Sequence, residues 1–317
     1  MNMLNMDIAQ SLKGRDFLGL ADYSSDEIRY LIDLGIELKR KLKAGVTHQP
    51  LKGKTLGMIF EKSSTRTRVS FDVGIYQLGG HSLFLSSNDL QIGRGESIHD
   101  TAQTLSRYLD GIMIRTFAHK KVIDLARYAT IPVINGLTDF AHPCQVMADY
   151  MTVLEHKGKL AGLKIAYIGD GNNMVHSLMV GAGKLGMHMA VASPEGYMPD
   201  KEVQKMTRDF AQQSGGSLLI TNDPKEAIAD ADIVYTDVWA SMGFEEEQKV
   251  REQAFAHYQV NESLVSHAKK DYIFMHCLPA HRGEEVSEGV VDGAHSVIFD
   301  EAENRLHAQK AIMAALM

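Results

Sequence analysis

Hydroxyl and guanidinium side chains alternate in one short stretch of this sequence. Residues 63–68 read Ser-Ser-Thr-Arg-Thr-Arg, and they follow the apolar run 55–60. The apolar run predicts a buried strand, and the apolar residues after 68 predict a helix. Free backbone N–H groups and the positive end of the helix dipole meet at such a junction. Together with three hydroxyls and two guanidinium groups, they predict a phosphate socket at 64–68.

A plain helix cap is the alternative interpretation of this stretch. A Ser or Thr cap followed by a solvated basic turn would give a similar composition. Such a cap uses one hydroxyl, however, and here three hydroxyls are interleaved with arginines. The lysine pattern of an ordinary nucleotide-binding loop is missing, which argues against a P-loop.

Polar side chains that could act on a carbonyl group follow two further predicted strands. Arg115 ends the apolar run 111–115, and His142 opens the sequence His-Pro-Cys-Gln after the strand predicted at 131–136. His142 could donate to a carbonyl oxygen, and Gln145 could bond an amide. Taken singly, Arg115 could be a surface arginine and His142 a helix cap.

The second half of the chain offers its own candidates. Residues 169–174, Gly-Asp-Gly-Asn-Asn-Met, match a dinucleotide-binding glycine motif only weakly, because Met174 replaces the third glycine. Asp237 leaves a predicted strand beside the only tryptophan, and residues 237–244 are expected to form a substrate loop. Cys277 lies near the end of the strand predicted at 272–280. Pro279 predicts extended backbone at the preceding residue, Leu278. A buried cysteine is usually an inert apolar residue.

Strands that alternate with helices position all these groups. The pattern predicts an α/β fold with mostly parallel sheets, in which ligands bind at the carboxyl ends of strands. Strands are expected at 55–60, 81–85, 111–115, 131–136, 164–169, 189–192, 218–220, 233–236 and 272–280, and helices at 24–43, 97–109, 146–156, 174–185 and from about 305 to 317. Ser24 and Glu27 form a capping box.

The overall composition limits the class of protein. With 317 residues and 44% hydrophobic content, the chain can form two domains with separate cores. A net charge of −7 does not suggest a nucleic-acid partner. No apolar run reaches the roughly 20 residues of a membrane span. Two cysteines and the lack of a signal-peptide pattern favour a cytoplasmic protein.

The motifs occur in the order found in a known family. The socket, Arg115, His-Pro-Cys-Gln, Gly-Asp-Gly-Asn-Asn, Asp-Val-Trp-Ala-Ser-Met-Gly and His-Cys-Leu-Pro together resemble the ornithine carbamoyltransferases, over nearly the whole chain. The first and third of these motifs are shared with the aspartate carbamoyltransferases. The resemblance implies two Rossmann-like domains, a carbamoyl phosphate domain at 1–148 and an ornithine domain at 149–299. The C-terminal helix at 300–317 returns to the first domain.

The resemblance also implies the substrates and the residues that hold them. The reaction is transfer of the carbamoyl group of carbamoyl phosphate to the δ-amine of L-ornithine, giving citrulline in arginine metabolism. The carbamoyl phosphate set is Ser64, Thr65, Arg66, Thr67, Gln91, Arg115, His142, Gln145, Cys277, Leu278 and Arg305. The ornithine set is Asn173, Asp237, Ser241 and Met242. The catalytic set is Arg115, His142, Asp237 and Cys277.

Within these sets, the implied roles differ. Thr67, Arg115 and His142 polarise the carbonyl oxygen, while Gln145 and the Cys277 and Leu278 carbonyls hold the carbamoyl NH2. Gln91 reaches a neighbouring subunit's site, since the family forms trimers, and a homotrimer or an assembly of trimers is expected. No metal or cofactor is expected, because the cationic side chains supply the charge. The carbonyl oxygen gains negative charge during attack, which these donors stabilise.

Three alternatives stay open at this stage. A sibling enzyme could carbamoylate putrescine or another amine, although residues 237–244 fit an amino acid. An NAD-dependent oxidoreductase could use residues 169–174, although the third glycine is missing. A catalytically silent relative could bind a partner, although every proposed chemical residue is present.

Overall fold

The computed structural model describes residues 3–87, 90–91, 95–240 and 247–317. Its backbone divides into two compact units, residues 1–151 with 303–317, and residues 152–302. The division points fall inside helices α6 (Pro143–Lys157) and α13 (Ile298–Leu316). The domain boundaries expected from the sequence, 148/149 and 299/300, fall inside the same two helices.

The first unit contains a parallel sheet of four strands in the order β2-β1-β3-β4. Its strands are β1 (Thr55–Phe60), β2 (His81–Ser86), β3 (Gly111–Arg115) and β4 (Val133–Leu137). Its helices are α1 (Met3–Leu12), the short η1 (Leu20–Asp22), α2 (Ser25–Lys43), α3 (Thr65–Gln77), α4 (Ile98–Leu105) and α5 (His119–Tyr128), with the first part of α6 and most of α13. Ile59, Ile112 and Val133 of the sheet pack with residues of α4 and α5 in a buried core.

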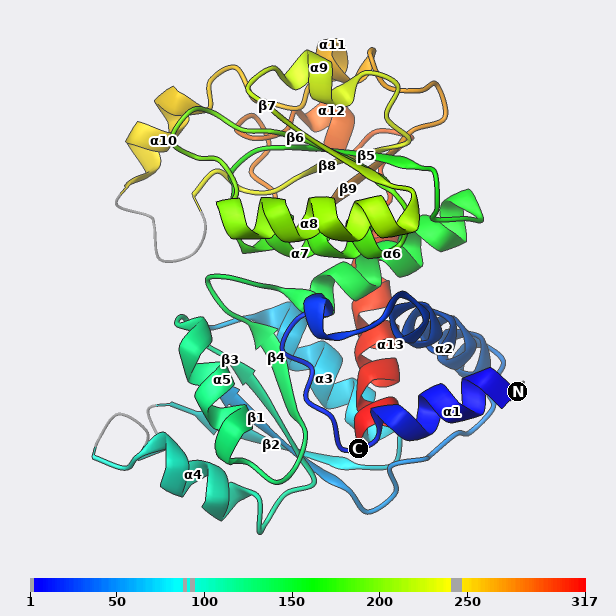
Figure 1. Cartoon of the computed structure of the whole chain (residues 1–317), viewed down its shortest axis with the longest axis vertical. Coiled ribbons are helices and arrows are strands. Elements are labelled where there is room, and N and C mark those ends of the chain that lie inside the picture. The colour runs from blue at the N-terminus through cyan, green and yellow to red at the C-terminus, as the bar shows by residue number, and fades with distance from the viewer. Residues whose placement is uncertain (1–2, 88–89, 92–94, 241–246) are drawn as a thin grey trace. The chain divides into compact units, whose positions relative to one another are not determined.

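The C-terminal helix α13 packs against α3 within this unit (Figure 1). A methyl group placed on Gly74 of α3 would meet Met313 Cε at 3.0 Å and Lys310 Cγ at 3.3 Å. Glycine at this helical position therefore lets the two helices approach closely, at a cost of roughly 1 kcal/mol in helix propensity. The predicted return of the last helix to the first domain is confirmed.

The second unit contains a parallel sheet of five strands in the order β7-β6-β5-β8-β9. Helices α7 and α8 cover one face, and α9, α11 and α12 cover the other (Figure 1). The strands are β5 (Lys164–Ile168), β6 (His188–Ala192), β7 (Ser217–Thr221), β8 (Ile233–Thr236) and β9 (Ile273–His276). The helices are α7 (Asn173–Lys184), α8 (Lys201–Ser214), α9 (Pro224–Ile228), α10 (Gln248–Ala254), α11 (Glu262–Val265) and α12 (Glu288–Val291).

The predicted fold class is confirmed, with several differences in element bounds. The capping box of Ser24 and Glu27 is present at the start of α2. Helix α4 ends at Leu105 rather than 109, because residues 106–108 form turns. Helix α3 begins at Thr65, inside the stretch expected to precede the helix. Strand β9 ends at His276, four residues before the predicted end. None of the described helices combines the length and the apolar composition needed to cross a bilayer.

Candidate active site

The socket lies where the order of strands in the first sheet reverses. Strands β1 and β3 are neighbours, with Phe60 opposite Arg115. The chain continues from β1 to β2 on one side of this pair and from β3 to β4 on the other side. Ligands of parallel α/β sheets bind at the carboxyl ends of strands at such a point. The residues after β1 and at the end of β3 are those predicted to bind phosphate.

Ser64 and Thr67 shape the start of α3. Ser64 is the N-cap residue, and its Oγ accepts from the Thr67 backbone N–H at 3.2 Å. Ser64 Oγ also donates to Thr67 Oγ1 at 3.1 Å. The cap alternative is thus correct for Ser64. Thr65 and Arg66 occupy the first turn of α3, where the dipole favours an anion, and neither is buried.

His142 lies within a cluster of cations in the first unit. Burial lowers the pKa of His142 well below its ordinary value, and the charges of Arg305, Arg115 and Arg66 lower it further. Lys62 adds a smaller effect of the same sign. Because neighbouring positive charge and burial both oppose protonation, the imidazole is neutral and can donate through one N–H. The structure therefore brings together three sequence-predicted residues with His142 at their centre.

The start of helix α6 positions this histidine. His142 immediately precedes α6, its carbonyl oxygen accepts from the Val146 N–H at 3.4 Å, and Pro143 occupies the first helical position. Proline suits this position because its missing N–H would have no partner in the helix. The same turn buries Cys144, whose pKa is raised to about 12 by burial, so this thiol stays protonated.

Arg305 links the socket to α6 inside the first unit. Its Nη1 donates to Gln145 Oε1 at 2.5 Å, and its Nη2 donates to Thr67 Oγ1 at 3.2 Å. Gln145 Nε2 in turn donates to Asp149 Oδ1 at 2.9 Å. With its amide oriented as its neighbours require, Gln309 accepts from Arg305 Nε at 3.1 Å and Nη2 at 2.8 Å. The expectation that Arg305 lies near a helix start is wrong, since it lies two turns inside α13.

Two residues of this region have no counterpart among the sequence predictions. Lys62 is buried, 3.3 Å from an Asp139 oxygen and over the ring of Phe117. Gln309 holds the far side of the Arg305 guanidinium. The position of Lys62 beside the socket in sequence is the one signal that could have identified it. Gln309 has the i+4 spacing from Arg305 on the same helix.

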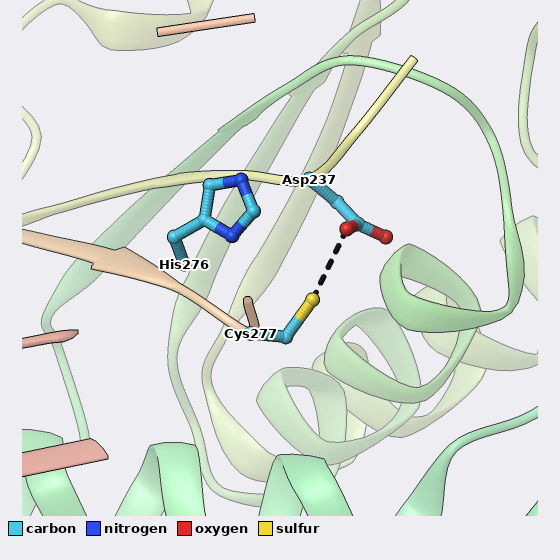
Figure 2. A group of neighbouring side chains, drawn as sticks. All are labelled: Asp237, His276 and Cys277. Carbon is cyan, nitrogen blue, oxygen red and sulfur yellow. Dashed lines mark hydrogen bonds between the residues drawn. The ribbon is translucent and has the colours of Figure 1, made fainter. Parts of the chain in front are cut away.

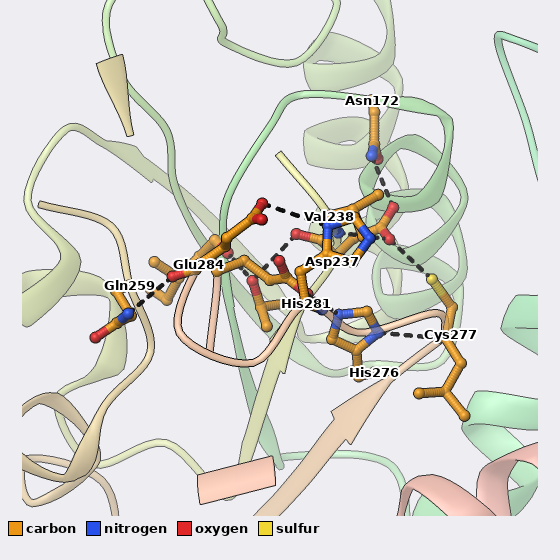
Figure 3. Close-up of polar contacts among 12 residues, drawn as sticks. Asn172, Asp237, Val238, Gln259, His276, Cys277, His281 and Glu284 are labelled. Atoms are coloured by element: carbon orange, nitrogen blue, oxygen red, sulfur yellow. Dashed lines mark hydrogen bonds and ion pairs between the residues drawn. The ribbon is translucent and has the colours of Figure 1, made fainter. Parts of the chain in front are cut away.

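Asp237 of the second unit receives three hydrogen bonds. Asn172 Nδ2 donates to its Oδ2 at 2.8 Å, while the Val238 N–H at 2.8 Å and Cys277 Sγ at 3.1 Å donate to its Oδ1 (Figure 3). Asp237 follows β8, Asn172 follows β5, and Cys277 follows β9, so three adjacent strand ends form this group. Asp237 and Cys277, which both belong to the predicted catalytic set, are therefore in contact.

Asn172, rather than Asn173, contacts Asp237. Asn172 is the N-cap of α7, and its Oδ1 accepts from the Met174 N–H at 2.9 Å, which turns its Nδ2 toward Asp237. Asn173 starts the helix and is 9% exposed. Asn172 is missing from the predicted ornithine set, because residue types alone do not fix the start of a helix to one residue.

Leu278 differs in conformation from the prediction. Leu278 has a φ of 57°, so the expectation of extended backbone before Pro279 is wrong. The Leu278 N–H donates to His276 Nδ1 at 2.9 Å. This local bond competes with the extended conformation and ends the strand at His276.

Asp237, His276 and Cys277 could together offer ligand atoms to a metal, since one atom from each lies within 4.8 Å of the others (Figure 2). Both ring nitrogens of His276 are engaged, however: Nδ1 accepts from Leu278, and Nε2 lies 3.0 Å from Glu285 Oε1. A metal here would have to displace one of these bonds. His281, Glu284 and Glu285 form a second group with the same spacing.

Arg251 holds the chain just beyond Asp237. Its Nη1 donates to Asp170 Oδ2 at 2.8 Å and to the Trp239 carbonyl at 2.9 Å, and its Nε donates to Glu247 Oε2 at 3.0 Å. Burial raises the pKa of Asp170 to about 6, against the opposing effect of the Arg251 charge. Trp239 stacks on Phe255 with ring centroids 5.9 Å apart.

Three sequence-predicted residues remain, and two of them lie outside the described residues. Ser241 and Met242 fall within 241–246 and lie outside the described residues. Gln91 is exposed, in the segment that follows β2.

Comparison with known proteins gives consistent matches over the whole chain. The family model "Aspartate/ornithine carbamoyltransferase, carbamoyl-P binding domain" matches residues 15–155, and the model "Aspartate/ornithine carbamoyltransferase, Asp/Orn binding domain" matches residues 161–316. A protein of Anoxybacillus flavithermus named ornithine carbamoyltransferase is 64% identical over 314 residues, which are 99% of this chain and 100% of the relative.

Two further relatives carry the same name. The ornithine carbamoyltransferase of Oceanobacillus iheyensis is 67% identical over 308 residues, covering 97% of this chain and 96% of the relative. The solved structure of ornithine carbamoyltransferase from Pyrococcus furiosus is 57% identical and superposes with a TM-score of 0.94. It covers 96% of this chain and 98% of its own.

Proposed function

This chain belongs to the aspartate/ornithine carbamoyltransferase family, and we propose that it transfers the carbamoyl group of carbamoyl phosphate to the δ-amine of L-ornithine, giving L-citrulline and phosphate. The observation that carries the proposal is the cation cluster around His142, contributed by Arg66, Arg115 and Arg305. A cluster of this charge suits a small dianion with a reactive carbonyl group.

In the first unit, the socket binds carbamoyl phosphate. The hydroxyls of Ser64, Thr65 and Thr67 and the guanidinium groups of Arg66 and Arg115 hold the phosphate. The Thr67 hydroxyl, Arg115 and the neutral His142 also donate to the carbonyl oxygen, which becomes more negative as the amine attacks. The leaving phosphate stays close to the arginines, whose charge stabilises it.

Gln145 and Arg305 orient the carbamoyl group. Since Arg305 donates to the Gln145 oxygen, the amide orientation of Gln145 is fixed. Its Nε2 is held by Asp149. The pair therefore presents a defined set of donors and acceptors rather than two freely rotating side chains. The roles of Cys277, Leu278 and Gln91 toward this substrate stay a prediction from the family resemblance.

In the second unit, Asp237 and Cys277 bind ornithine and prepare its amine. The free δ-amine has a pKa near that of lysine, about 10.4, so it must lose a proton before it attacks. We assign Asp237 to orienting the amine and easing this loss, with Asn172 and Cys277 holding the carboxylate in place. Asn173, Ser241 and Met242 are proposed to complete the ornithine site.

An assay of amine-dependent phosphate release, with citrulline identified as the product from ornithine, tests the proposal directly. Purified protein is supplied with carbamoyl phosphate and, in parallel, with L-ornithine, putrescine and L-lysine. We expect citrulline from ornithine, with a kcat/KM at least 100-fold above the value for putrescine, because the α-carboxylate and α-amine add binding groups (a factor worth about 2.7 kcal/mol). Equal turnover of putrescine would favour the alternative amine specificity instead.

We also propose that the chain forms a homotrimer or an assembly of trimers. Support comes from an apolar strip on the outer face of α3, where Val69, Val73 and Tyr76 are 53%, 37% and 76% exposed. Leu83 and Phe84 of β2, at the edge of the sheet, are also exposed. Exposed apolar patches of this kind mark protein contacts. A single-chain mass by light scattering would contradict the proposal.

A cytoplasmic location is proposed as well. Both cysteines are free thiols, which suits a reducing compartment. Fractionation of the native host tests this.

A further inference from the structure

A cavity of about 400 Å³ lies in the first unit and shares no lining residue with the phosphate socket. The end of α2, loop residues 45–49 and the end of α3 line this half-open cavity, and α13 contributes Lys310. Its polar lining includes Lys41, His48 and Lys310, and its apolar lining includes Leu38 and Leu42. The volume is in the range of small-molecule sites.

Lys310 is the most unusual residue in this lining. It is 4% exposed, and its ammonium donates to Gln77 Oε1 at 2.8 Å. Gln77 is neutral, and within the described part of the chain no carboxylate lies within 4.0 Å of the Lys310 ammonium. Burial lowers its pKa. Since a buried cation without an opposite charge is costly, an anion in the cavity would relieve this cost.

Lys41 brings a second positive charge to the same cavity, near His48. Burial lowers the pKa of His48, and the charges of Lys41 and Lys310 lower it further, whereas Glu37 acts in the opposite direction. Both lysines are therefore close enough to affect one imidazole. Glu37 lies 3.6 Å from the Lys41 ammonium, but it also pairs with Arg40 at 2.9 Å, so its charge is shared.

We propose that this cavity is a second anion site, which binds the phosphate group of a small phosphorylated metabolite between Lys41, His48 and Lys310. The amide groups of Gln49 and Gln77 are further donors on its wall. Leu38, Leu42 and Val46 provide an apolar surface for the carbon part of the ligand. The site is separate from the proposed catalytic socket and takes no part in the transfer reaction.

Equilibrium dialysis with radiolabelled inorganic phosphate tests the proposal, because it counts bound anions per chain. We expect two phosphates per chain in the unaltered protein, one in the socket and one in the cavity. Lys41→Met should weaken one of the two sites at least tenfold and leave the other, while citrulline formation stays unchanged. Lys310→Met should have the same effect on binding and serves as an independent variant.

Lys43→Met is the matched control. Lys43 lies on the same helix, pairs with Glu303 at 3.1 Å and does not line the cavity. The proposal is overturned if the unaltered protein binds one phosphate, or if both Lys41→Met and Lys310→Met bind as Lys43→Met does. Glycerol 3-phosphate should displace the phosphate from this site. If phosphate binds but glycerol 3-phosphate does not displace it, the proposal that the site takes a small phosphorylated metabolite is wrong. A failed citrulline assay, in contrast, would contradict the proposed function and the role of the socket, and would leave the second anion site untouched.

Discussion

Replacing Asp170 by asparagine should change how the stability of the second unit depends on pH. Asp170 pairs with Arg251 at 2.8 Å, and their side chains are 13% and 9% exposed. Two opposing effects act on this carboxylate. Burial raises its pKa and the Arg251 charge lowers it, and burial prevails, giving a pKa of about 6 in place of 3.8.

The sign of the effect follows from this shift. Since the folded protein holds the Asp170 proton more tightly than the unfolded chain, this group stabilises the fold at low pH. The contribution is lost as the pH rises through about 6. A shift of about two pKa units corresponds to about 3 kcal/mol, of which about 2 kcal/mol falls between about pH 4.5 and pH 7. Asparagine does not titrate and lacks this dependence.

Trp239 makes the measurement specific to the second unit. It is the chain's only tryptophan, it is buried, and it lies in the unit that contains Asp170. Urea unfolding followed by its fluorescence, at several pH values, gives the free energy of unfolding for both proteins. We expect the unaltered protein to lose about 2 kcal/mol relative to the Asp170→Asn variant between about pH 4.5 and pH 7.

The control is an aspartate with the opposite shift. The pKa of Asp271 is lowered by its hydrogen bond with Lys157, so its contribution to stability changes only below about pH 4, and Asp271→Asn should differ from the unaltered protein by a nearly constant amount between about pH 4.5 and pH 7. A constant difference between the unaltered protein and Asp170→Asn would refute the reasoning. A difference that appears only below about pH 4, in favour of the unaltered protein as the pH rises, would mean that the Arg251 charge outweighs burial.

Four further predictions concern the proposed active site. Arg66→Ala should reduce kcat/KM for carbamoyl transfer roughly 100- to 1,000-fold, as loss of one transition-state donor does, with an unchanged circular dichroism spectrum; full activity would contradict the socket assignment. The His142 imidazole should not titrate between about pH 6 and pH 8 by NMR, because its pKa is lowered, and the resonance missing in His142→Gln identifies it. Arg305→Lys should raise the KM for carbamoyl phosphate at least tenfold (about 1.4 kcal/mol), because lysine cannot bond Gln145 and Thr67 with one planar group; an unchanged KM would remove Arg305 from the site. Asp237→Asn should lower kcat with ornithine at least 100-fold and leave the KM for carbamoyl phosphate unchanged. If only the KM for carbamoyl phosphate changed, Asp237 would not belong to the ornithine site.

Patterns within a few residues were predicted well from the sequence. Strands β1 and β3 have the expected bounds, since short apolar runs bordered by polar residues define them. The capping box at Ser24 also follows from neighbouring residue types. Element ends were less certain: β9 stops at His276, because a side-chain acceptor takes the Leu278 N–H, and no apolar pattern reports such a bond.

Contacts between distant segments could not be predicted in the same way. The bond from Arg305 to Gln145 spans 160 residues, and the carboxylate of Asp237 meets Asn172 only because β5 and β8 are neighbours in the sheet. The choice of Asn172 over Asn173 depends on where α7 starts, to a single residue.

The sequence by itself determined the residue types at the strand ends, the α/β class and the family resemblance, because these depend on local composition and order. Only the tertiary structure decided which of those ends lie together and which charges act on one another. It made His142 neutral by burying it among arginines, and it left Lys310 buried beside a cavity. The physical reason is that burial and Coulomb interactions depend on distances in space. The order of the strands sets those distances, and no short segment of the sequence predicts that order.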